Sequence, residues 1–153
     1  MTTESILNIG SVSKLVTSTA ALLLWEKGKI DLDGDVSQYL PFSVEHPSGG
    51  GPITVRQLLT HTSGLQDGEY YDDSYACGDP VVSLEKWLRG YLVEGGPYYD
   101  EGNFLEQAPG TTFEYSNVGY GLLGLIVQQV SGQNFTTFTR ENIFEPLGMG
   151  STG

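Results

Sequence analysis

The sequence predicts a mainly helical, single-domain chain with almost no β-strand. Its composition is that of a globular protein, since 39% of its 153 residues are hydrophobic and 17% are charged. Five or six segments carry the apolar spacing and end signals of helices, whereas only the lead-in at residues 1–10 has an extended character. A complete α+β enzyme contains more strands than this. We therefore expect residues 1–153 to form mainly the helical part of such a fold.

The expected helices are separated by glycine, proline and polar residues. Gly28 and Gly132 are typical of positions just after a helix, and Pro146 cannot continue one. Thr54 followed three residues later by Gln57 predicts a capping box at a helix start. Helices are expected at about 12–27, in a short segment ending near 40–41, from 54 to about 64, and at 84–92, 118–130 and 136–144, with loops over 66–80 and 94–114.

The first expected helix carries apolar side chains around most of its surface, so we expect it to be buried on most sides. Its apolar stretch is far shorter than the ~20 residues of a membrane span. No cationic stretch precedes it and no small-residue cleavage site follows it, so the chain as written shows no signal peptide. These observations predict a core helix and leave the compartment open.

The chain is strongly acidic, with 19 Asp and Glu against 7 Lys and Arg and a formal net charge of −12. This charge repels polyanions, so neither nucleic acid nor an anionic membrane surface is an expected partner. Alternating aspartates at 31–35 resemble a calcium loop but lack the glycine and glutamate that an EF-hand needs. Cys77 is the only cysteine and has no catalytic motif around it. We expect no metal and no cofactor.

Ser11-Val12-Ser13-Lys14 places a serine and a lysine three residues apart at the start of the first helix. Residues at this spacing share a helix face, so the amine of Lys14 can reach the hydroxyl of Ser11. A serine needs a neighbouring base to act as a nucleophile. A desolvated lysine has a lowered pKa and can be that base, and the helix N-terminus favours negative charge developing at Ser11. Taken alone, the motif is weak evidence for catalysis, because a serine at a helix start is usually only a cap.

Ser83-Leu84-Glu85-Lys86 repeats the same spacing and provides a comparison within the chain. The helix behind it is amphipathic, so Lys86 is expected to point into water and keep its charge. Ser83 is then only an N-cap.

Tyr115-Ser116-Asn117 is the second candidate element. A tyrosine beside a cationic lysine can be held as a phenolate and relay a proton. The side chain of Asn117 can both donate to and accept from a substrate amide. The simpler interpretation is a core tyrosine followed by Asn117 as the N-cap of the helix at 118–130.

Taken together, these elements resemble the serine β-lactamases of class C type and their relatives, the D-alanyl-D-alanine carboxypeptidases, D-aminopeptidases and β-lactamase-fold esterases. The similarity extends over ordered blocks along almost the whole chain, at residues 9–14, 26–33, 39–41, 53–65, 109–110, 113, 115–120, 123–124 and 146–149. This resemblance implies an α+β fold of the β-lactamase/transpeptidase type, of which this chain covers mainly the helical part with most sheet strands missing.

The resemblance also implies roles for individual residues. Ser11 resembles the acylated nucleophile, Lys14 its partner, and Tyr115 the general base and proton relay. Asn117 resembles the residue that binds the amide or carbonyl of the substrate. His61 lies in a block where the family has a scaffold residue, so we assign it a structural role. The implied partner is a small-molecule ester, amide or D-peptide, and the sequence does not distinguish among β-lactam, D-peptide and ester substrates.

The chain departs from the family pattern in two respects, since we expect the strands before Ser11 to be missing as well as the third motif. Such enzymes carry a third motif, Lys-Thr-Gly or His-x-Gly, on a strand after the helical region, and nothing after Asn117 fits it. The missing strand would supply one oxyanion-hole amide, so we expect residues 1–153 alone to be nearly inactive. By the motifs and strands that it contains, the sequence covers about half of a typical family member. Helices that normally pack on a sheet would leave an apolar surface open to self-association.

Two other functions are compatible with the sequence. The chain could be a non-catalytic remnant that keeps the helical scaffold and binds a partner. A helical interaction module of another class would require all the ordered blocks to arise by chance.

Overall fold

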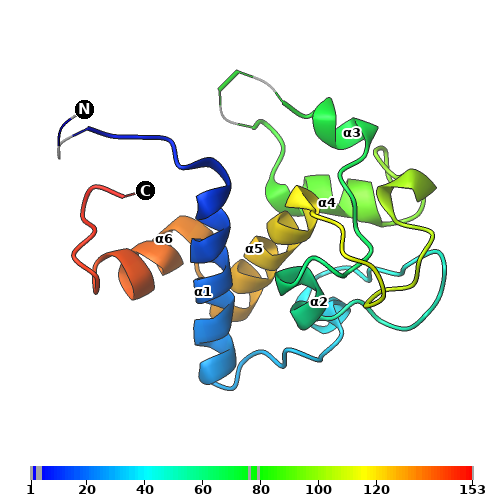
Figure 1. Cartoon of the computed structure of the whole chain (residues 1–153), viewed down its shortest axis with the longest axis horizontal. Coiled ribbons are helices and arrows are strands. Elements are labelled where there is room, and N and C mark those ends of the chain that lie inside the picture. Colours follow the sequence, from blue (N-terminus) through cyan, green and yellow to red (C-terminus); the bar gives the residue numbers. More distant parts are fainter. Residues whose placement is uncertain (1, 3–4, 76, 79, 153) are drawn as a thin grey trace.

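The computed structural model of the chain describes residues 2, 5–75, 77–78 and 80–152. Figure 1 shows α1 and α5 at the centre, with α2, α3 and α4 on one side and α6 on the other. The α-helices are α1 (Ser13–Glu26), α2 (Val55–Leu59), α3 (Glu69–Asp72), α4 (Leu84–Leu92), α5 (Asn117–Ser131) and α6 (Phe135–Thr139). Shorter turns are η1 (Gly10–Val12), η2 (Val36–Tyr39), η3 (Glu101–Asn103) and the π-helical η4 (Arg140–Phe144).

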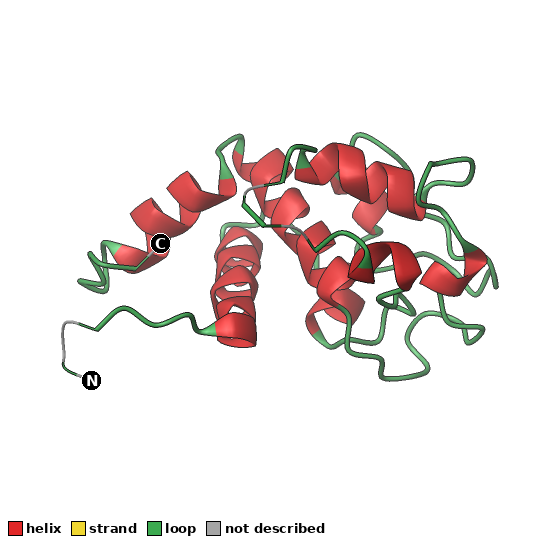
Figure 2. Cartoon of the chain, turned by 90° about the horizontal axis from the view of Figure 1, so that it is seen from above, coloured by secondary structure: helices red, strands yellow, loops and turns green. Residues whose placement is uncertain are grey.

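Helices and loops make up almost the whole of the described chain (Figure 2). Its β pairing is limited to two isolated antiparallel bridges, Asp35 with Thr54 and Leu65 with Phe104. The predicted predominance of helix is therefore confirmed. Over residues 5–75, 77–78 and 80–152, no helix is long and apolar enough to cross a membrane.

The central element of the hydrophobic core is α5. It packs against α1, α2, α4 and α6, and most of its apolar side chains are fully buried. Gly132 follows the helix with a φ of +70°, a left-handed conformation that glycine adopts without strain, so the helix ends where the sequence predicts. The predicted last helix at 136–144 is present as α6 followed by η4.

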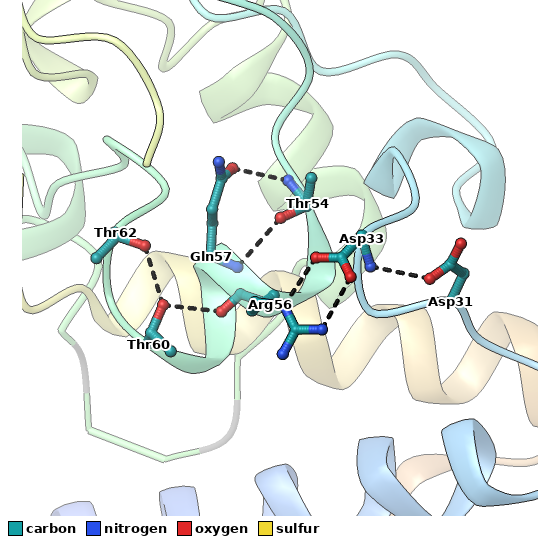
Figure 3. Close-up of polar contacts among 7 residues, drawn as sticks. All are labelled: Asp31, Asp33, Thr54, Arg56, Gln57, Thr60 and Thr62. Atoms are coloured by element: carbon teal, nitrogen blue, oxygen red, sulfur yellow. Dashed lines mark hydrogen bonds and ion pairs between the residues drawn. The ribbon is translucent and has the colours of Figure 1, made fainter. Parts of the chain in front are cut away.

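Side-chain capping fixes the start of α2 and its position relative to the preceding loop (Figure 3). The Thr54 hydroxyl accepts a hydrogen bond from the backbone N–H of Gln57, and the Gln57 side chain accepts one from the N–H of Thr54. The predicted capping box is thereby confirmed.

Arg56 forms two hydrogen bonds with the carboxylate of Asp33, at 2.7 and 2.8 Å. This helix ends at Leu59, earlier than the predicted Gly64.

The first helix is less buried than its sequence predicts. Ala20, Ala21 and Leu24 are buried, whereas Leu15 and Trp25 are 68% and 49% exposed. Burial on most sides was the wrong expectation, because α1 is contacted by α5, α6 and η4 while Val12, Leu15, Leu22 and Trp25 stay exposed. We refer to this surface as the outer face of α1, which consists of Val12, Leu15, Leu22 and Trp25.

The two segments predicted as loops contain short helices, α3 within 66–80 and η3 within 94–114. Both are too short to give a periodic apolar signal, and η3 begins with a local cap in which the Asp100 side chain accepts a hydrogen bond from the N–H of Gly102. The amino-terminal ends of α1 and α5 lie at the same end of the molecule (Figure 1). This arrangement brings residues about 100 positions apart into one site.

Candidate active site

Ser11 lies in η1, the tight turn that leads into α1, and Lys14 lies in the first turn of α1. The amine of Lys14 is 3.4 Å from the hydroxyl oxygen of Ser11, within hydrogen-bond range. The predicted spacing therefore brings the two side chains together. Gly10 precedes the serine with a φ of +51°, a backbone conformation that favours glycine at this turn. Lys14 is half-buried and not free in bulk solvent.

Tyr115 reaches the same point from the loop before α5. Its hydroxyl donates a hydrogen bond to the Ser11 hydroxyl at 2.7 Å, and the Lys14 amine lies 4.7 Å from the centre of its ring. Hydrogen bonding to Lys14, followed by that to Ser11, lowers the pKa of Tyr115 below its ordinary value of 10.0. A nearby ammonium stabilises the phenolate form of a tyrosine.

Asn117 completes the cluster as the first residue of α5. The Lys14 amine donates a hydrogen bond to its side-chain oxygen at 2.5 Å. Asn117 is not the N-cap that the sequence suggests, because the cap is Ser116, whose hydroxyl accepts from the N–H of Gly119 at 2.9 Å. The side chain of Asn117 is thus left to contact the site. The structure brings all four predicted site residues together.

Asp67 is a residue of the site that the sequence reasoning missed. One oxygen of its carboxylate accepts from the N–H of Asn117 at 3.0 Å and from the Asn117 side-chain amide at 2.7 Å. The other accepts from the N–H of Val118 at 3.0 Å and from the Ser116 hydroxyl at 3.2 Å. A carboxylate at the start of a helix also interacts favourably with the helix dipole. Asp67 therefore fixes the orientation of Asn117.

His61 has contacts that fit the structural role assigned from sequence. Its ring stacks on Tyr115 at 4.5 Å between ring centres, and its Nδ1 accepts a hydrogen bond from the N–H of Ser116 at 3.1 Å. Burial, followed by the positive charge of Lys14, lowers the pKa of this histidine below 6.5. A neutral imidazole keeps Nδ1 free to accept that bond. His61 holds the loop of Tyr115 against the rest of the site.

The second Ser-x-x-Lys behaves as predicted. The Ser83 hydroxyl accepts a hydrogen bond from the N–H of Lys86 at 3.3 Å and caps α4, and both residues are exposed. Equal spacing in the sequence therefore produces a helix cap at one place and a side-chain cluster at the other.

Cys77 is exposed and is a free cysteine. In the described part of the chain, no group of three histidine, cysteine, aspartate or glutamate side chains is arranged to hold a metal ion.

Comparison with known proteins places the chain in a family. The family model of beta-lactamases matches residues 1–153, the whole of the sequence. The chain belongs to the beta-lactamase family. Its fold is that of the β-lactamases and transpeptidases, and the members of this family are serine hydrolases.

Individual relatives show the extent of the match. Protein flp of Staphylococcus aureus is 34% identical over 145 residues, which are 94% of this chain and 27% of that protein. The D-amino acid amidase of Ochrobactrum anthropi superposes with a TM-score of 0.71 at 29% identity, covering 97% of this chain and 38% of that one. An octameric penicillin-binding protein homologue of Pyrococcus abyssi gives 0.66 at 31% identity, over 92% and 31% respectively. The chain thus spans about a third of these proteins, less than the half expected from sequence.

Proposed function

We propose that the chain belongs to a serine hydrolase that cleaves an ester or amide through an acyl-enzyme on Ser11. The observation that carries the proposal is the 2.7 Å hydrogen bond between the hydroxyls of Tyr115 and Ser11, made next to the ammonium of Lys14. It joins a nucleophile to a base whose pKa is lowered, which is the pairing that serine catalysis needs.

In the first half of the reaction the phenolate of Tyr115 removes the proton of Ser11 as the serine oxygen bonds to the carbonyl carbon of the substrate. Lys14 stabilises the phenolate by its charge before the transfer. Tyr115 then gives this proton to the departing alkoxide or amine, and the acyl group stays on Ser11. Loss of the proton reverses the hydrogen bond, because the phenolate accepts from Ser11 where the phenol donates to it.

In the second half of the reaction a water molecule takes the place of the leaving group. Tyr115 removes one proton from this water, whose oxygen bonds to the acyl carbon. The Ser11 oxygen then leaves and recovers a proton from Tyr115, which restores the starting state. The substrate carbonyl oxygen needs two amide donors in both halves, of which the backbone N–H of Ser11 is one.

Asn117 is proposed to bind the amide or carbonyl group of the acyl part of the substrate. Its side-chain oxygen accepts from Lys14 and its amide nitrogen donates to Asp67, so the carboxamide is held in one orientation. A polar group fixed in this way before binding costs little to order when the substrate arrives. Penicillins, D-peptides and simple esters all provide such a group.

The alternative is a non-catalytic chain that retains the scaffold of the family. In the family that the sequence resembles, the second oxyanion donor lies on the strand that carries the third motif, and no segment after Asn117 matches that motif. Losing one such donor costs about 10²–10³ in turnover. The proposal therefore predicts slow but Ser11-dependent chemistry in this chain.

The test is hydrolysis of p-nitrophenyl acetate by the chain and three variants. Ser11→Ala should abolish the protein-dependent rate, and Tyr115→Phe should lower it by about 10²–10⁴, the usual contribution of a general base. Ser83→Ala removes the serine of the second Ser-x-x-Lys and should leave the rate unchanged. Equal rates for the Ser11 and Ser83 variants would refute the proposal.

A further inference from the structure

His61 holds the chain on both sides of Tyr115. The N–H of Glu114 donates a hydrogen bond to the backbone carbonyl of His61 at 2.8 Å, and the N–H of Ser116 donates one to Nδ1 of its ring at 3.1 Å. The ring stacks on that of Tyr115, with centres 4.5 Å apart. Three contacts to one residue thus fix the tyrosine whose hydroxyl meets Ser11.

The backbone of His61 has an uncommon conformation. Its φ is +55°, and among the described residues it is the only one other than glycine with a positive φ. Histidine and asparagine enter this region more readily than most side chains, although it still costs conformational energy. An outlier placed next to reacting groups points to a function of the side chain that it orients. Here the imidazole is oriented against Tyr115 and also against Tyr120, whose ring centre is 4.8 Å away.

The hydrogen bond from Ser116 exists only while the imidazole is neutral. A neutral ring has one nitrogen that accepts, here Nδ1, whereas a protonated ring donates from both nitrogens. Protonation of His61 would therefore direct its own N–H at that of Ser116, and two donors repel each other. The hydrogen bond on the carboxyl side of Tyr115 would be lost.

The groups that face His61 come from α1, α5 and two loops. The amine of Lys14 is 4.7 Å from the ring centre of Tyr115 and 5.7 Å from that of Tyr120, the two phenols that contact the imidazole. Burial, followed by the charge of Lys14, lowers the pKa of His61 below its ordinary value of 6.5, and the charge of Asp67 opposes this shift. The imidazole is therefore neutral at neutral pH and takes up its proton only in acid.

We propose that His61 is a pH-sensitive positioning residue, whose neutral imidazole holds Tyr115 on Ser11 and whose protonation releases it. The inference rests on the proposed function, because it takes Tyr115 to be the base that acts on Ser11. Two protons then stop the reaction in succession as the pH falls. The first converts the phenolate of Tyr115 into the phenol, and the second frees the loop of Tyr115 from His61.

Two variants separate the accepting atom from the ring. In His61→Asn the side-chain oxygen can accept from the N–H of Ser116 in place of Nδ1, and asparagine tolerates the positive φ but does not titrate. In His61→Phe a ring can still stack on Tyr115, but nothing accepts from Ser116. Both variants keep His46, the other of the two histidines in the chain.

The first experiment measures the rate at which p-nitrophenyl acetate acetylates Ser11, followed by mass spectrometry between about pH 4 and about pH 9. In the unmodified chain the rate should change about a hundredfold per pH unit below the pKa of His61 and about tenfold per unit above it, because two groups must lose a proton in the first range and one in the second. His61→Asn should show the tenfold dependence in both ranges. His61→Phe should share that dependence and be slower than His61→Asn by about fivefold or more, the contribution of one hydrogen bond.

The outcomes separate the role of His61 from the proposed function. A hundredfold dependence that survives in His61→Asn would overturn the inference, because some group other than His61 would then take up the second proton. Equal rates for His61→Asn and His61→Phe would also overturn it, since the accepting atom would not matter. Either result leaves acylation of Ser11 standing. A Ser11 that is not acetylated at any pH would refute the proposed function, and with it the part of His61 in the reaction.

A second experiment does not depend on the reaction. Nuclear magnetic resonance can follow the ring nitrogens of His61 together with the nuclear Overhauser effect between the ring of Tyr115 and the β protons of Ser11. This effect should weaken with the same pH midpoint as protonation of the His61 ring, and in His61→Asn it should persist to lower pH. An effect that stays constant while the ring of His61 titrates would overturn the inference, whether or not Ser11 is acylated.

Discussion

Replacing Asp67 with asparagine tests how the start of α5 is held. The carboxylate accepts four hydrogen bonds, two on each oxygen, from Ser116, Asn117 and Val118. In Asp67→Asn one oxygen becomes an amide that can only donate, so two of the four bonds are lost. A hydrogen bond to a charged group contributes about 1.5–3 kcal/mol, so we expect the free energy of unfolding to fall by about 3 kcal/mol.

Urea unfolding followed by circular dichroism at 222 nm measures this loss. With a slope near 2 kcal/mol/M, the expected change lowers the midpoint by about 1.5 M. Glu106→Gln makes the same chemical change at an exposed carboxylate and should stay within about 0.5 kcal/mol of the unmodified chain. An Asp67→Asn midpoint equal to that of Glu106→Gln would refute the reasoning that this carboxylate holds the helix start.

Three further predictions concern the base, the capping box and the outer face of α1. In a titration of tyrosinate absorbance at 295 nm, Tyr115→Phe should remove an ionisation that lies below the ordinary tyrosine value, because Lys14 and Ser11 lower the pKa of Tyr115; identical low-pH titration of the chain and the variant contradicts the assignment. Thr54→Ala should reduce the free energy of unfolding by about 1 kcal/mol through loss of the cap on Gln57, as measured by urea unfolding; no loss would mean that the box contributes nothing. Because Leu15 is 68% exposed on an apolar face, the chain should self-associate in sedimentation velocity and Leu15→Glu should weaken the association; a concentration-independent monomer would contradict this.

The helix ends were predictable because their signals are local. The Thr54–Gln57 capping box and the glycine at 132 act through atoms within a few residues of the helix end. The residues that determine where each helix begins or ends are therefore neighbours in the sequence. The spacing of Ser11 and Lys14 is local in the same sense. Tyr115 and Asn117 are about a hundred residues away, and only the resemblance to a family linked them to Ser11.

Asp67 could not be found in this way. Its four hydrogen bonds join positions about 50 residues apart, and in the sequence it lies in the segment 66–80 that was predicted to be a loop. The capping assignment of Asn117 was wrong for a related reason. Ser116 and Asn117 are both good caps, and the choice between them depends on Asp67 and Lys14, which are distant in sequence.

The burial of α1 was overestimated for another physical reason. An apolar pattern shows which side chains can be buried, but burial also needs a partner surface. The first helix has apolar residues around most of its circumference, and only the side towards α5 and α6 is covered. The N- and C-terminal segments extend beside α1, away from α2, α3 and α4, in both views (Figures 1 and 2).

The central claim is that Ser11 is the nucleophile. The chain offers its own control, since Ser83 begins a Ser-x-x-Lys of equal spacing on an exposed helix start. The most direct measurement is peptide mapping by mass spectrometry after a brief reaction with p-nitrophenyl acetate and an acid quench. The account predicts an acetyl group on the peptide of Ser11, none on that of Ser83, and loss of the label in Tyr115→Phe. Acetylation of both serines to the same extent, or of Ser83 alone, would contradict it.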